Sequence, residues 1–251
     1  MTPLEALLVF VAGIGAGTIN AVVGSGTLIT FPTLLAVGYP PVIANVSNTV
    51  GLVPGSVSGA VGYRRELQGQ LPRLRRLGVA SILGGITGAL LLLRLPESAF
   101  KAIVPVLIAL GCVLVVAQPW ISRRIRLRES APAHGSAAVL VLVYLTGVYG
   151  GYFGAAQGVL LIAILGIGLA ESLQRINAAK NVLAGLVNAV AAVVFIVASD
   201  VAWSAAAAIA AGSILGGVIG SSVGRRLQPT ILRGVVVLVG VIAIAKLVFF
   251  A

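Results

Sequence analysis

The chain has 251 residues, of which 59% are hydrophobic and 9% are charged, whereas a soluble domain carries about 25% charged residues. With a mean hydropathy of +1.12, this composition excludes a soluble domain, a nucleic-acid-binding protein and a disulfide-bonded scaffold, and it predicts an all-α polytopic membrane protein. The formal net charge of +11 comes from arginines in short runs between apolar segments. Basic residues at such places set the orientation of the chain in the membrane.

Ten apolar segments follow one another along the chain. The first ten residues hold Glu5 but no Lys or Arg, so we expect the first segment to be retained and not removed as a signal peptide. The second and seventh segments are too short to cross about 30 Å of hydrocarbon as helices, and each follows a glycine-rich break, so they are expected to be half-crossings. The predicted segments are 4–23, 27–38, 41–63, 77–95, 98–120, 136–156, 158–169, 174–198, 201–223 and 230–250.

The sequence contains an internal repeat. The string Ser81-Ile82-Leu83-Gly84-Gly85, with Gly88 after it, returns 132 residues later as Ser213-Ile214-Leu215-Gly216-Gly217 with Gly220. The same ungapped offset pairs residues from the first glycine-rich break to the last hairpin, which favours a duplication over chance matches in apolar sequence. We therefore divide the chain into a first transmembrane repeat (1–120), a basic connector expected to be cytoplasmic (121–135) and a second transmembrane repeat (136–251). The repeated glycines themselves are expected to serve close helix packing.

Charge decides between parallel and inverted repeats. Arginines concentrate in 64–76, 123–128 and 225–233, and the positive-inside rule places all three regions in the cytoplasm. They share one side only if each broken region, 4–38 and 136–169, enters the membrane and returns. The predicted fold is therefore two inverted repeats, each a broken or re-entrant helical hairpin followed by three transmembrane helices, with both termini on the outer side.

The two breaks supply the first candidate binding residues. A discontinuous helix within the bilayer presents backbone N–H groups and the positive end of a helix dipole, which suit an anionic group. Ser25, Gly26 and Thr27 open the first half-helix, Gln157 and Gly158 open its mate, and Asn20 lies one turn before the first break. Packing or capping offers another explanation of these residues.

A second candidate cluster consists of amides and hydroxyls that need partners in a membrane. Asn45 and Ser47 are also in a position to cap their own helix. Lys180 either snorkels to the cytoplasmic edge or supplies the positive charge for a bound anion. Asn188 is a weaker candidate, also explained as an interhelical contact. The cluster comprises Asn45, Ser47, Asn48 and Thr49 in the first repeat and Asn177, Lys180 and Asn181 in the second.

The sequence lacks the patterns of an enzyme or a metalloprotein. His134 is the single histidine, and there is no HExxH, CxxC or P-loop motif, so we expect no catalytic residue, metal or cofactor. Every acidic residue falls at a terminus or in a predicted loop, so no buried carboxylate relay is visible. A coupling ion would then bind neutral polar groups, use an acid at a segment end such as Glu171, or travel on the substrate.

Two stretches of the chain resemble a known family. GAGTINAVVGSGTLITFPTLLAVGYPPVIANVSNTVGLVPGSVSGAVGY, residues 15–63, is similar to the first repeat of the TauE/SafE sulfite exporter family, and GVYGGYFGAAQGVLLIAILGIGLAESLQRINAAKNVLAG, residues 147–185, is similar to the second. Thr27 stands where a third glycine is common, and residues 154–158 are not a clean glycine triplet. The resemblance implies a permease for sulfite, sulfonates or related sulfur-containing anions in a bacterial inner membrane.

The sequence alone thus predicts an inner-membrane permease, expected to be an exporter, for a small anion that moves by alternating access. Membrane lipid and the anion are the expected partners, nucleic acid is not, and a homo-oligomer is an open possibility. Two alternatives stay open: a membrane-embedded assembly or signalling partner that transports nothing, and a permease for an unrelated solute such as a metal ion. The scarcity of acids, Cys and His within the segments argues against divalent cations.

Overall fold

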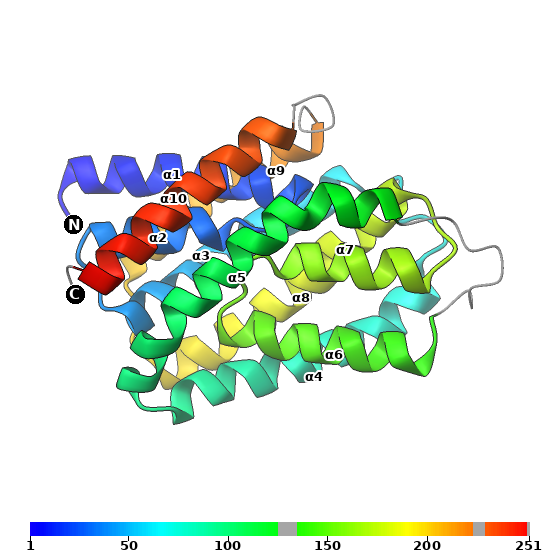
Figure 1. Ribbon diagram of the computed structural model, residues 1–251, viewed down its shortest axis with the longest axis horizontal. Helices are drawn as coiled ribbons and strands as arrows, with labels where there is room; N and C mark the ends of the chain where they lie inside the picture. Colours follow the sequence, from blue (N-terminus) through cyan, green and yellow to red (C-terminus); the bar gives the residue numbers. More distant parts are fainter. Residues whose placement is uncertain (125–134, 223–228, 250–251) are drawn as a thin grey trace.

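The computed structural model describes residues 1–124, 135–222 and 229–249, and every element in them is an α-helix (Figure 1). Residues 125–134 of the predicted connector, Arg225 and Arg226 lie outside the described residues. The helices are α1 (Pro3–Val22), α2 (Thr27–Ala36), α3 (Pro41–Gly62), α4 (Leu71–Arg94), α5 (Glu97–Arg124), α6 (Ala137–Tyr152), α7 (Gln157–Gly168), α8 (Leu173–Ala198), α9 (Trp203–Ser222) and α10 (Pro229–Phe249).

Five of these helices are long and apolar enough to cross a membrane: α1, α4, α8, α9 and residues Glu97–Trp120 of α5. The helix α3 has 22 residues, but its buried amides and hydroxyls lower its hydropathy. The shorter α2 and α7 have 10 and 12 residues, about 15–18 Å of helix, and are half-crossings by length. The prediction of an all-α polytopic membrane protein is confirmed.

Most predicted boundaries agree with the structure to within two residues, and three do not. The helix α4 begins at Leu71 and not at residue 77, because Pro72 suits the first turn and arginine is a good helix former despite its low hydropathy. The helix propensity of arginine also explains why α5 continues past residue 120 to Arg124. In contrast to these two longer helices, α6 is shorter than predicted: it ends at Tyr152 and not at residue 156, and a non-helical turn follows it.

The short helices form two hairpins that enter the protein from opposite ends. The α1–α2 hairpin opens at the end that carries the N-terminus, where Met1 and Glu5 line a pocket with 37–39. The α6–α7 hairpin opens at the other end, where Gly135 and Gly168 both lie against Val139. The two tips meet midway between the ends, where the amide of Gly158 donates to the carbonyl of Gly24 over 3.0 Å (Figure 1).

Helix packing follows the same scheme in both halves. All of these pairs join the two halves of the chain: α1–α9 and α3–α9 correspond to α6–α4 and α8–α4, α2–α10 corresponds to α7–α5, and α3–α8 and α5–α10 pair helices with their own counterparts. Such a recurrence is what a duplication of the chain predicts. Glycines make the tightest crossings possible, since a Cβ added at Gly88 would overlap the carbonyl of Val148 and one at Gly216 that of Ile14.

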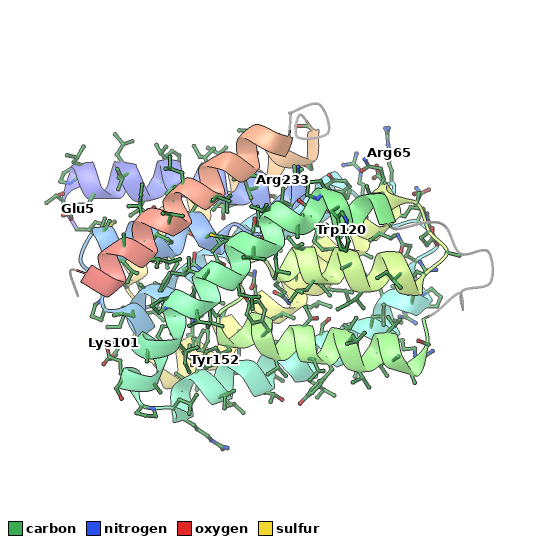
Figure 2. The ribbon with its side chains drawn as sticks, viewed as in Figure 1. Glu5, Arg65, Lys101, Trp120, Tyr152 and Arg233 are labelled. Carbon is green, nitrogen blue, oxygen red and sulfur yellow. The ribbon has the colours of Figure 1, made fainter. Side chains whose placement is uncertain are left out.

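The two ends of the helical bundle differ in charge. Figure 2 shows Glu5 and Lys101 at one end and Arg65 at the other. Glu97, Lys101 and Asp200 line a pocket at the first end with the N-terminal residues of α3. Arginines dominate the second end, which includes Arg64, Arg65, Arg73, Arg75, Arg76 and Arg175, with Glu66 and Glu171 as its described acids, whereas Arg94 ends α4 at the first end.

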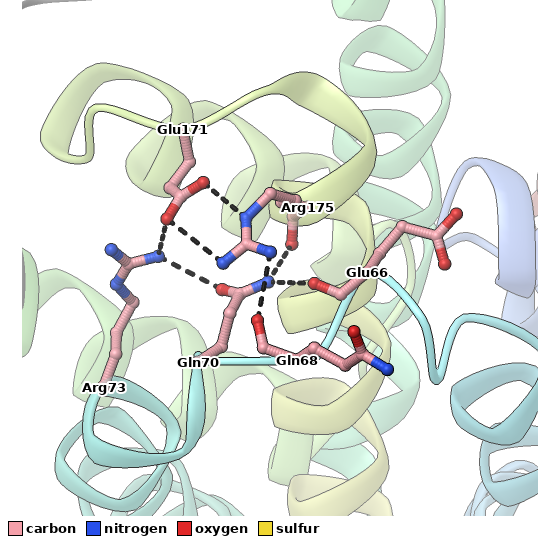
Figure 3. A network of polar contacts seen from close by, with 6 residues as sticks. All are labelled: Glu66, Gln68, Gln70, Arg73, Glu171 and Arg175. Atoms are coloured by element: carbon pink, nitrogen blue, oxygen red, sulfur yellow. Dashed lines mark hydrogen bonds and ion pairs between the residues drawn. The ribbon is translucent and has the colours of Figure 1, made fainter.

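An ion-pair network ties α4 to α8 at the arginine-rich end (Figure 3). The carboxylate of Glu171 pairs with Arg73 over 3.0 Å and with Arg175 over 2.6 Å, and the side-chain amide of Gln70 donates to the carbonyl of Arg175 over 3.0 Å. Burial alone would raise the pKa of Glu171, but the hydrogen bonds and charges of the two arginines outweigh it and hold that pKa below its ordinary value. Glu171 is therefore a structural anion at this end of the protein.

Candidate functional site

The tip of the α1–α2 hairpin leaves backbone donors unused. Gly24 has φ of +86°, a left-handed conformation that glycine adopts without strain, and it turns the chain into α2. The first amides of α2 that find a described acceptor are those of Leu28, to Ser25, and Ile29, to Gly26. The hydroxyl of Ser25 is buried and has no partner among the described atoms. This helix start therefore offers the donors and dipole that favour an anion.

The tip of the α6–α7 hairpin has a similar turn but uses its donors. Ala156, which the offset of 132 residues pairs with Gly24, is also left-handed, with φ of +60°. The amides of Gln157 and Gly158 donate to Gly154 and Gly24 over 3.2 and 3.0 Å, so the predicted free N–H groups of this half-helix are occupied in this conformation. The side-chain nitrogen of Gln157 is buried without a partner, as is the hydroxyl of Ser25, its counterpart at the same offset.

Side chains of α8 converge on the end of α1. The ammonium nitrogen of Lys180 donates to the carbonyls of Asn20 and Ala21 over 2.8 and 3.2 Å. The side-chain amides of Asn177 and Asn181 also donate to the carbonyl of Ala21, each over 3.2 Å. One carbonyl oxygen, which has two lone pairs, thus faces three donors. The predicted residues Asn177, Lys180 and Asn181 come together, and Asn20 joins them through its carbonyl.

Lys180 settles one of the open alternatives. Its side chain is 0% exposed, and its methylene chain passes Gly158, since a Cβ added there would lie 2.9 Å from Cδ of the lysine. Snorkelling to the cytoplasmic edge is therefore wrong for this lysine. It lies where the tips of the two hairpins meet.

Side chains of α3 reach both hairpins. The amide of Asn45 donates to the carbonyl of Tyr152, the last residue of α6, over 3.0 Å. The amide of Asn48 donates to the hydroxyl of Thr27 over 3.4 Å, and its oxygen accepts from the hydroxyl of Thr30. These two predicted residues therefore connect α3 with the ends of the broken helices.

Two other members of the α3 cluster make hydrogen bonds away from the hairpins. The hydroxyl of Ser47 accepts from the amide of Ala202 over 2.9 Å and so caps α9. The hydroxyl of Thr49 donates to the carbonyl of Asn45 within its own helix over 2.9 Å. Since α3 begins at Pro41, the suggestion that Asn45 or Ser47 caps that helix is wrong.

The structure adds groups that sequence reasoning did not name. Thr30 lies one turn after Thr27 on the same helix, and this spacing was a usable signal. The carbonyls of Ala21 and Tyr152 had no signal, because any residue supplies a backbone oxygen. Asn188, the weaker candidate, makes a long contact of 3.5 Å with the hydroxyl of Ser56, its counterpart at the offset of 132 residues.

The junction of the two tips contains one lysine and several amide donors. The ion pairs of the described residues join Arg73, Lys101 and Arg175 to Glu97 or Glu171, and none includes Lys180. The described residues contain no group of three His, Cys, Asp or Glu that could hold a metal. One lysine, several amides and the open start of α2 therefore lie together at this junction.

Comparison with known proteins agrees with these features. The family model described as Sulfite exporter TauE/SafE matches residues 9–247. The "Probable membrane transporter protein YfcA" of Escherichia coli (strain K12) is 26% identical over 257 residues, which cover 99% of this chain and 91% of that protein. A "Probable membrane transporter protein" of Haemophilus influenzae is 28% identical over 243 residues, 96% of this chain and 94% of the relative.

A further relative covers part of the chain. The "Probable membrane transporter protein ORF9" of Sinorhizobium sp is 31% identical over 149 residues, 59% of this chain and 56% of that protein. No solved structure matches the chain. The family model nevertheless spans both hairpins and nearly all ten helices, and the chain therefore belongs to the TauE/SafE family of membrane transporters.

Proposed function

We propose that this transporter is an inner-membrane permease that exports a small anion, with sulfite, sulfonates and other sulfur-containing anions as the substrate class. The observation that carries the proposal is Lys180, a fully buried lysine at the meeting point of the two hairpins with no described carboxylate paired to it. A cation buried in a membrane protein requires compensation. A bound anion supplies it.

The surroundings of Lys180 favour an anion over a cation. Asn177 and Asn181 place amide donors beside it, and the start of α2 contributes unused N–H groups and the positive end of its dipole. Among the described helices, acids occur only in the first turns of α1 and α5, as Glu5 and Glu97. A cation would find no carboxylate at the junction.

The arrangement of the hairpins supports alternating access. They enter from opposite ends, and a single backbone hydrogen bond, from Gly158 to Gly24, joins their tips. Alternating access between the two repeats (1–120 and 136–251) then opens the junction to one side at a time. We place the arginine-rich end in the cytoplasm and both termini outside, following the positive-inside rule.

Transport by the purified protein in lipid vesicles tests the proposal. Wild-type protein should carry at least one of sulfite, thiosulfate, sulfate, taurine, sulfoacetate and chloride, and Asn48→Ala combined with Lys180→Ala should abolish that flux. Lys101→Ala removes a lysine that is paired with Glu97 at the protein surface over 3.2 Å and serves as the matched control. Flux that is unchanged in the double variant would refute the site, and a wild-type protein that carries none of these anions would refute the substrate class.

A thermal-shift series in detergent gives independent evidence on the site. A ligand that binds the folded protein alone raises its stability with occupancy, so the transported anion should raise the melting temperature of wild type and of Lys101→Ala. It should not raise that of Lys180→Ala. An equal shift in all three proteins would place the anion elsewhere.

A further inference from the structure

Lys180 makes two hydrogen bonds, and this number bears on its protonation. The two acceptors are the carbonyls of Asn20 and Ala21, and no other described group accepts from its nitrogen. A neutral amine has two N–H donors, whereas an ammonium has three. The two carbonyls therefore satisfy both N–H donors of a neutral amine and leave one donor of an ammonium without a described acceptor.

Desolvation leads to the same conclusion. Lys180 is 0% exposed, and burial of an unpaired ammonium costs far more than burial of a hydrogen-bonded amine. The α1 terminus, whose dipole is negative at this end, offsets part of that cost. A full counter-charge comes only with a bound anion. The closed junction thus favours two states, one with a neutral lysine and no anion, the other with an ammonium and an anion.

No other titratable side chain of the helices around Lys180 lies where it could bind this proton instead. The helices α3 and α7 carry none of Asp, Glu, His, Lys or Arg, and the only such residue of α1 is Glu5 at its far end. On α4, Arg73, Arg75 and Arg76 lie at the arginine-rich end, where Arg73 pairs with Glu171, and Arg94 lies at the far end of the helix. On α8 itself, Arg175 pairs with the same acid. The remaining titratable groups are the tyrosines of α6, among them Tyr149, which donates to the carbonyl of Ala155 over 2.5 Å.

We propose that Lys180 carries the coupling proton, so that each transport step moves an anion together with a proton bound to this amine. The proposal rests on the anion permease function above and deepens it. When the junction opens to water, the amine takes a proton from water and the ammonium binds the anion. On the other side the anion leaves, one Nζ–H bond breaks with its electron pair retained by nitrogen, and the proton passes to water.

The acceptor arrangement explains how the empty transporter returns. Once deprotonated, Lys180 has two N–H donors for the carbonyls of Asn20 and Ala21, which belong to the opposite half of the protein. Those bonds close the empty junction without a buried charge. The net direction then follows the sum of the anion and proton gradients, and export occurs whenever the internal excess of anion outweighs the proton gradient.

The test measures protons and anions together in vesicles. Thiosulfate and sulfoacetate are suitable probes, because neither binds a proton near neutral pH and neither can carry one itself. With wild-type protein and with Lys101→Met, entry of anion should acidify the vesicle interior, with about one proton for each anion. A vesicle interior made alkaline should also drive accumulation of the anion above its external concentration.

Lys180→Arg separates charge from proton exchange. A guanidinium stays protonated at every working pH, so the slower flux that remains should carry no protons, and the ratio should fall from about one to zero. If wild type moves these anions without protons, or Lys180→Arg keeps the wild-type ratio, the coupling is wrong while the permease function stands. If wild type moves none of the anions tested, both proposals fail.

A proton-uptake measurement is decided by the wild-type protein, so it does not depend on variants that fold. Addition of thiosulfate to the purified protein in weakly buffered detergent at mildly alkaline pH should take up protons, because the anion binds with the ammonium form. Lys101→Met should show the same uptake and Lys180→Met none. Binding of thiosulfate by wild type without proton uptake would overturn the inference, whatever the variants do.

Discussion

Gly158 gives the sharpest test of how the two hairpins meet. Its amide donates to the carbonyl of Gly24, and a Cβ added to it would lie 3.0 Å from that carbonyl oxygen and 2.9 Å from Cδ of Lys180. The same Cβ would overlap the α-carbon of Gly24. Gly158→Ala therefore cannot be accommodated by rotation of a side chain, and the two backbones must separate.

The expected cost follows from those contacts. Overpacking of a tight interior costs about 1–3 kcal/mol, and loss of the hydrogen bond to Gly24 adds about 1 kcal/mol. At about 2–4 °C for each kcal/mol in a chain of this size, the melting temperature in detergent should fall by at least about 4 °C. Transport should fall as well, because the tips no longer close on each other.

A second glycine provides the control. A Cβ added to Gly234, in α10, meets no atom within 4 Å, and alanine is a better helix former than glycine by about 1 kcal/mol. Gly234→Ala should therefore melt at or slightly above the wild-type temperature and transport normally. If Gly158→Ala melts within about 1 °C of wild type, the tips are not in the close contact described here, and the account of the closed junction fails.

Three further predictions concern the surroundings of the junction. Asn45→Leu should cost about 1–3 kcal/mol, because it leaves the buried carbonyl of Tyr152 without its donor, and chemical denaturation measures it. Ser47→Ala should cost about 1 kcal/mol by removal of the cap on the amide of Ala202, with no effect on anion affinity, and weaker anion binding would contradict this purely structural role. Glu171→Gln should lower the melting temperature near neutral pH, with the wild-type advantage complete above pH 4.5, the ordinary pKa of the carboxyl, and lost as the pH falls through the lower folded-state pKa. A melting difference that persists in strong acid would show that this carboxylate is not what stabilises α4 against α8.

The helices and their order were predictable because a membrane leaves so few choices. Backbone groups in hydrocarbon must be satisfied within helices, so hydropathy and the glycine-rich breaks together located the ten helices that the structure describes. The limits of that signal appear at α4, where the low hydropathy of the arginines moved the predicted start to residue 77, although the helix begins at Leu71. They appear again after Tyr152, where the chain leaves the helix although its residues stay apolar or small.

The candidate residues were predictable as types, and their partners were not. Amides and a lysine in apolar sequence need hydrogen bonds somewhere, and this need singled out Asn45, Asn177 and Lys180. Their partners are backbone carbonyls at the ends of broken helices. Any residue carries a carbonyl, so only the three-dimensional path of the chain shows which ones are free to accept.

The two halves use equivalent positions differently, and this difference is the basis of the mechanism proposed here. The offset of 132 residues pairs Lys180 with Asn48, and Asn45 with Asn177. Asn45 and Asn177 act alike, since each donates to the carbonyl at the end of the opposite hairpin's first helix. Asn48 binds the threonines of α2 in its own half, whereas Lys180 reaches across to α1. A second lysine at residue 48 would place two buried amines at one junction, and closure without an anion would then require both of them to lose a proton. A lysine in one half and an asparagine in the other therefore suits a site that closes over one anion and one proton, or over neither.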